Sequence, residues 1–155
     1  MLKRAMVAVM LLGACAQIGR AEETVSCLKE EETPSILAVT GFHSVEDKAN
    51  KLEIRLLEAD SSGDVAKNPV ALFLVMTDNG PAGDSPTHTW RLPEGVSVVK
   101  KLTVAKNRGQ ILAVVDGQMD ERTGRFPLQN QIISITYRFA KGVLSDKIRV
   151  TTSKP

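Results

Sequence analysis

Short segments in which apolar and polar residues alternate run along the chain, separated by clusters of turn-forming residues. The alternation is strict at the C-terminal side, where Ile133, Ile135, Tyr137 and Phe139 occupy every second position. Successive side chains of a β-strand point to opposite faces, so this pattern is typical of a strand with one buried face. We therefore expect these four side chains to face the core.

Other segments carry related patterns. Residues 51–58 alternate except at Leu57, and residues 70–76 are apolar on both faces, as in a central strand covered on each side. Trp90 shares one face of an alternating segment with His88 and is predicted to be a core residue. The remaining predicted strands are residues 36–40, 87–92, 102–105, 111–115 and 148–150. Residues 44–50 allow a helical turn.

Turn signals divide these segments. Residues 106–110 separate two apolar runs and predict a hairpin in which Gly109 supplies a positive φ. Lys141 and Gly142 predict a second tight turn. Longer loops are expected at residues 60–64, 77–86 and 118–130.

About eight short strands at this spacing predict an all-β fold, a single antiparallel β-sandwich that is immunoglobulin-like or similar. The length of 155 residues fits one domain. We expect an export signal at residues 1–21, an acidic lead-in or tether at residues 22–34, and the sandwich domain at residues 35–155.

The N-terminus has the features of a secretory signal. Lys3 and Arg4 precede an uninterrupted apolar run at residues 5–12, which is too short to span a bilayer. Cleavage after Ala21 would give a periplasmic or secreted protein. Alternatively, Cys15 ends a segment typical of a bacterial lipobox and would carry lipid, anchoring the protein to a membrane. No transmembrane helix is expected in the mature chain.

Charge is uneven along the chain. Removal of residues 1–21 leaves 17 basic side chains against 18 acidic ones, which argues against nucleic-acid binding. Residues 22–60 carry a net charge of −6, and residues 91–155 carry +7. Either strands from the two halves pair and their charges interleave, or the C-terminal strands form a basic face for an acidic partner.

The best candidates for partner binding are four basic residues around the hairpin of residues 106–110. They are Lys100, Lys101, Lys106 and Arg108. A hairpin end projects from a sheet, so these charges would have few strand neighbours to compensate them. A solvated turn with no partner is the alternative interpretation.

No motif for catalysis or metal binding is present. The chain has two histidines, His43 and His88, and after removal of residues 1–21 Cys27 is its only cysteine. Blue-copper and zinc sites need closely spaced ligands of these types, which this order does not provide. Oxygen ligands at Asp78, Asn79 and Asp84 would allow calcium, although turn formation alone explains these residues. We expect no catalytic residues and no cofactor.

These observations favour an exported, non-catalytic binding or interaction module of the cell envelope or the extracellular space. Its partner is expected to be another protein. One alternative is a small exported enzyme or metal-binding carrier whose site is assembled from residues distant in sequence. The other is a protein inhibitor that presents the loop at residues 77–86 to a hydrolase.

Overall fold

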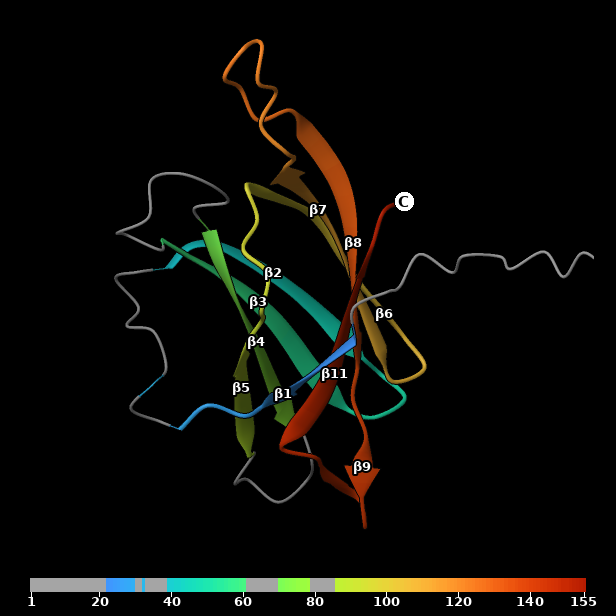
Figure 1. The fold of residues 1–155 in the computed structure, drawn as a ribbon. Coiled ribbons are helices and arrows are strands. Elements are labelled where there is room, and N and C mark those ends of the chain that lie inside the picture. Colours follow the sequence, from blue (N-terminus) through green and yellow to red (C-terminus); the bar gives the residue numbers. More distant parts are fainter. Residues whose placement is uncertain (1–21, 30–31, 33–38, 61–69, 79–85) are drawn as a thin grey trace, which may run out of the picture.

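The computed structural model of the chain describes residues 22–29, 32, 39–60, 70–78 and 86–155. Two antiparallel β-sheets lie face to face, accompanied by a short separate hairpin (Figure 1). The predicted all-β sandwich is confirmed. The predicted export signal, Cys15 and most of the loop at residues 77–86 lie outside the described residues. Within the described ranges there is no helix long and apolar enough to cross a membrane.

The four-stranded sheet consists of strands that follow one another in sequence. Its order is β2 (Val39–Asp47), β3 (Leu52–Asp60), β4 (Val70–Asp78) and β5 (Thr87–Arg91). All three neighbouring pairs are antiparallel. β4 lies between β3 and β5, and its inward residues Leu72, Leu74 and Met76 are fully buried. On its other face Ala71 and Val75 are only partly buried, so the predicted cover on both faces is incomplete.

The five-stranded sheet has the order β1-β11-β8-β7-β6. Its strands are β1 (Glu22–Ser26), β6 (Val98–Ala105), β7 (Arg108–Asp116), β8 (Leu128–Thr136) and β11 (Lys147–Ser153). The separate hairpin is formed by β9 (Phe139–Ala140) and β10 (Val143–Leu144). Apart from β1, neighbours in both sheets are consecutive along the chain or, for β8 and β11, separated only by the β9–β10 hairpin. This order differs from the Greek-key order of an immunoglobulin domain.

The chain passes from one sheet to the other at residues 96–97. The backbone N–H of Val96 donates to Val70 at the start of β4, and the next N–H, that of Ser97, donates to Val114 in β7. The edge strands β2 and β6 therefore belong to different sheets and lie against each other on one side of the sandwich.

The core is the space between the two sheets. Ile133, Ile135 and Tyr137 are fully buried, and Phe139 is half-buried against the same cluster, so the predicted inward face is confirmed. Trp90 is also fully buried, as predicted, and its indole N–H donates to the carbonyl of Asp146 at 2.9 Å.

Two expectations about local structure were wrong in part. Residues 22–34 were expected to be a tether or an irregular lead-in, but Glu22–Ser26 form β1, which pairs along the edge of β11 and packs Val25 against the core. The helical turn allowed at residues 44–50 is absent. β2 remains paired with β3 as far as Asp47, because Val45 and Asp47 face inward, and only residues 48–51 form a turn.

The hairpin of residues 106–110 is present, but Gly109 does not supply the positive φ. Lys106 and Asn107 adopt φ values of 51° and 60°, the left-handed pair that a type I′ hairpin turn requires. Gly109 lies within β7, opposite Val104. The turn predicted at Lys141 and Gly142 has the expected form, with φ values of 53° and 79°.

Candidate functional site

The four basic residues predicted for partner binding lie on one hairpin but not at one place. Lys106 and Arg108 are exposed at the turn between β6 and β7, whereas Lys100 and Lys101 lie towards the other end of β6. A strand rises about 3.3 Å per residue, so roughly 15–20 Å of strand separates the two pairs. The structure therefore divides the predicted cluster.

Lys100 and Lys101 have a structural explanation. The pairing between β6 and β7 shifts register between Val99 and Lys101, which makes Lys100 the extra residue of a bulge on an edge strand. Its ammonium donates to the side-chain oxygen of Asn130 at 2.8 Å. Bulges and lysines are common means by which edge strands avoid pairing with other chains. We therefore assign this pair to protection of the sheet edge.

Lys106 and Arg108 instead have basic neighbours from other turns. The β2–β3 turn lies beside the β6–β7 turn (Figure 1), and the side chain of Asn50 donates a hydrogen bond to the side-chain oxygen of Asn107. The same region receives the end of β8, because the backbone N–H of Tyr137 donates to Asn107 at 3.2 Å. We call the exposed cations of these adjoining segments the basic turn surface. They are Lys48, Lys51, Lys106, Arg108 and Arg138.

Sequence analysis missed Lys48, Lys51 and Arg138. They are distant in sequence from the hairpin, and only the contact between two turns brings them to it. The turn at residues 48–51 was not predicted, so the sequence pattern gave no signal that places its lysines beside the hairpin. Within the described ranges, no carboxylate forms an ion pair with any of the five cations.

A buried polar cluster holds the turns in place. Asp47 at the end of β2 is only 5% exposed, and the hydroxyl of Tyr137 donates to its Oδ2. The side-chain N–H group of Asn50 donates to the same carboxylate oxygen at 2.6 Å. Because Asn50 also donates to Asn107, one connected set of hydrogen bonds links β2, the β6–β7 turn and the end of β8.

The ionisation of this cluster follows from its hydrogen bonds. Burial alone would raise the pKa of Asp47, but hydrogen bonds from Tyr137 and Asn50 outweigh it and leave the pKa below its ordinary value. Burial and the neighbouring Asp47 carboxylate raise the pKa of Tyr137 well above its usual range. At neutral pH the pair is thus a carboxylate and a neutral phenol, a structural support for the turns above it.

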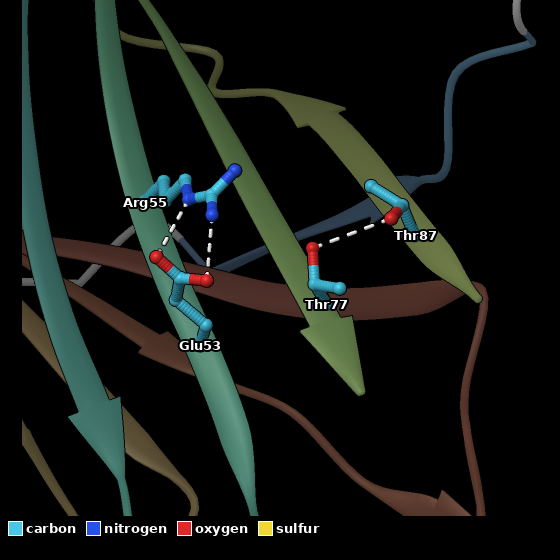
Figure 2. A network of polar contacts seen from close by, with 4 residues as sticks. All are labelled: Glu53, Arg55, Thr77 and Thr87. Carbon is cyan, nitrogen blue, oxygen red and sulfur yellow. Dashed lines mark hydrogen bonds and ion pairs between the residues drawn. The ribbon is translucent and has the colours of Figure 1, made fainter. Parts of the chain in front are cut away.

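The outer face of the four-stranded sheet carries charges of a different kind. Arg55 donates two hydrogen bonds to Glu53, at 2.8 and 2.6 Å, and Thr77 and Thr87 form a hydroxyl pair at 3.3 Å across β4 and β5 (Figure 2). The contact with Arg55 lowers the pKa of Glu53 and raises the pKa of Arg55. These four groups satisfy one another's hydrogen bonds.

A histidine–carboxylate pair lies on the inner face at the β2 edge. His43 Nε2 is 2.7 Å from Glu58 Oε1, and both side chains are largely buried. Gly41 stands opposite Glu58, and a Cβ there would lie only 2.7 Å from the carboxylate oxygen. This pair depends on a bulge after Val39, which the sequence pattern does not predict.

The other residues considered for chemistry do not assemble into a site. The Cys27 thiol is unpaired and half-buried, and it donates to the carbonyl of Leu28 at 3.5 Å. His88 stacks on Trp90 with ring centroids 5.6 Å apart. Among the residues that the structure describes, no group of three or more histidine, cysteine and acidic side chains could hold a metal ion.

The loop predicted at residues 118–130 is an arm only as far as Pro127, because Leu128–Asn130 already belong to β8. The arm joins β7 to β8 and projects at the top of Figure 1. Gly117 donates to the carbonyl of Pro127 at 2.8 Å, and Asp120 donates to that of Arg125 at 2.8 Å. The arm exposes Met119 and Phe126, and its tip is charged. It lies at the other end of β7 from the basic turn surface and is not part of that site.

Comparisons of the chain with protein-family models, with curated proteins and with solved structures found no match.

Proposed function

We propose that this chain is an exported, non-catalytic binding module that recognises an acidic partner protein through the basic turn surface. The observation that carries the proposal is a set of five exposed cations on turns that a buried hydrogen-bonded cluster holds together. Unpaired charges of one sign attract a partner of opposite charge over long distances and accelerate association. Turns fixed in advance lose little conformational freedom on binding.

A charge-reversal experiment tests this proposal. A photo-crosslinking residue in place of Ala49, between Lys48 and Lys51, would capture the partner in a native envelope extract. A polyglutamate peptide serves as the acidic probe until the partner is identified. We expect the double variant Lys48→Glu and Lys51→Glu to weaken binding by about tenfold or more, and added salt to slow association, because exposed charges are screened over roughly 8–10 Å.

The matched control is the double variant Lys100→Glu and Lys101→Glu. It changes the net charge by the same amount, but on the five-stranded sheet, in residues that protect the edge of β6. We expect this control to bind nearly as well as the unchanged chain. Equal weakening in both double variants would mean that only the net charge matters, and would refute a defined surface.

Export is a second part of the proposal, and it rests on the charged and apolar pattern of residues 1–21. The intact mass of the mature protein tests it. A chain that begins at Glu22 would agree with a periplasmic or secreted protein. A chain that begins at an acylated Cys15 would replace this with a membrane-anchored lipoprotein, and a mass that includes Met1 would refute export.

A further inference from the structure

A hollow of about 450 Å³ lies on the outer face of the five-stranded sheet, directly beside the β6–β7 turn. It is an open depression of the size that small-molecule sites commonly have. Ala105 stands opposite Arg108 at the end of the β6–β7 pairing, and both are exposed. Because alanine contributes only a methyl group there, the space beside the arginine stays empty.

Hydrogen-bond donors from three strands line this hollow. Arg108 of β7 is paired with Thr136 of β8, so the guanidinium and the hydroxyl group start from neighbouring positions on one face. Thr103 of β6 and Gln110 of β7 form the next pair along that face, and Lys106 lies at the turn itself. The lining includes two cations and no carboxylate.

Most of these donors have no partner within the molecule. The Thr103 hydroxyl donates to the carbonyl of Gln110 at 3.5 Å. In the described residues, the side chains of Lys106, Arg108, Gln110 and Thr136 form no hydrogen bond or ion pair. A guanidinium offers a planar fork of donors that matches the oxygens of phosphate and related anions. The hollow thus combines free space, positive charge and unused donors.

We propose that this hollow binds the tetrahedral oxyanion of a small molecule, a phosphate or sulfate ester group, with Arg108 as its principal contact. Lys106 supplies the second positive charge, and Gln110 and Thr136 donate to the remaining oxygens. The site shares Lys106 and Arg108 with the basic turn surface, but it does not depend on an acidic partner protein. Occupancy by a small anion would neutralise part of that surface and reduce its attraction for such a partner.

Titration of the full mature chain with phenyl phosphate, phenyl sulfate and the two inorganic anions tests the proposal by NMR chemical-shift changes. We expect saturable changes confined to residues 103–110 and to Thr136. The ester that binds more tightly identifies the source of the oxyanion. Arg108→Gln should weaken binding by about tenfold or more, the loss of a charge-assisted, forked contact. Arg122→Gln, which removes an equally cationic side chain that is 93% exposed on the distant arm, should leave binding unchanged.

The decisive variant is Ala105→Leu, which fills the hollow and removes no charge. We expect it to abolish the saturable changes and to retain binding of the polyglutamate probe. Conversely, the double variant Lys48→Glu and Lys51→Glu should weaken binding of the polyglutamate probe and leave anion binding in the hollow unchanged. Anion binding that persists in Ala105→Leu, changes spread over all basic residues, or no saturable change at millimolar ester would overturn the hollow as a site. None of these three results would affect the proposed partner surface.

Discussion

The outer face of the four-stranded sheet and the basic turn surface both expose charged side chains, but Arg55 and Glu53 on the sheet form an ion pair, whereas the cations of the basic turn surface form none with the described residues. Arg55 and Glu53 form two hydrogen bonds with each other, two positions apart on one strand (Figure 2). On the turns, Lys51 and Lys106 come from segments distant in sequence and have no acidic partner in the described chain. Charged residues therefore indicate a binding surface only when the fold leaves them uncompensated.

The two regions also differ in what lies beneath them. The basic turns rest on Asp47 and Tyr137, a polar pair in the interior. Glu53 and Arg55 of β3 instead lie on the opposite face of the strand from Ile54, which belongs to the apolar core. We therefore expect the loss of one buried hydrogen bond to destabilise the turns, and substitutions on the surface of the sheet to change the free energy of unfolding little. The following experiments test that contrast.

The largest effect is expected from Ile135→Ala in β8. Ile135 is fully buried and packs beside Gly109, so it supports the hairpin that carries Lys106 and Arg108. Truncation should lower the free energy of unfolding by about 2–5 kcal/mol, measured in urea. Ser134→Ala, on the opposite face of the same strand, serves as the control. A loss below about 1 kcal/mol would mean that this face is not core.

A smaller loss is expected from Tyr137→Phe. The variant keeps the ring in the core but removes the hydroxyl that donates to Asp47. A buried acceptor that loses its donor costs about 1–3 kcal/mol, which urea unfolding can measure. Weaker anchoring of the β6–β7 turn should also increase hydrogen exchange at the Tyr137 amide, which donates to Asn107. An unchanged stability would show that the cluster does not support the turns.

Acid should act on the same cluster. The pKa of Asp47 in the fold lies below its ordinary value of 3.8, so its ionised form contributes stability above that value. This contribution is lost as the pH falls through the lowered pKa of the folded state. The unchanged chain should therefore lose stability below about pH 4 more steeply than Asp47→Asn does. Parallel pH profiles for the two proteins would contradict this assignment.

The smallest effects are expected from the surface charges themselves. Arg55→Gln removes one partner of an exposed ion pair, so the urea midpoint should fall slightly or not at all. Lys106→Gln removes one of several like charges, so the midpoint should stay or rise slightly. Added salt should weaken the pair on the sheet and relieve repulsion on the turns. Identical salt responses for the two regions would remove the distinction between them.

Local pattern was sufficient to predict much of the fold. The alternation at residues 133–139 predicted the inward direction of Ile133, Ile135 and Tyr137, although β8 ends at Thr136. The apolar run at residues 70–76 predicted a strand in the interior of the sheet, and β4 lies between β3 and β5. The strand at Glu22–Ser26 escaped prediction because its stability comes from pairing with β11 at the other end of the sequence. Its own residues are almost all exposed, so no alternation marks it.

The candidate site was only half predictable. Lys106 and Arg108 could be identified because the residues around them are sufficient to predict a hairpin turn. Lys48 and Lys51 could not be joined to them, because the link is a hydrogen bond between Asn50 and Asn107. The separation of Lys100 from the turn was missed because a linear cluster was taken as a spatial one, whereas a strand spreads its residues along its length.

The pairing of β1 with β11 has a consequence for the order in which the chain folds. Every other strand pair in the two main sheets joins consecutive strands or, for β8 and β11, strands separated only by a small hairpin, so these contacts close short loops. β1 is synthesised first among the described strands, yet its partner emerges last. The strand β1 must therefore wait for its partner until β11 has been synthesised. In pulsed hydrogen exchange during refolding, amides bonded between β1 and β11 should gain protection after those of the β3–β4 and β7–β8 pairs.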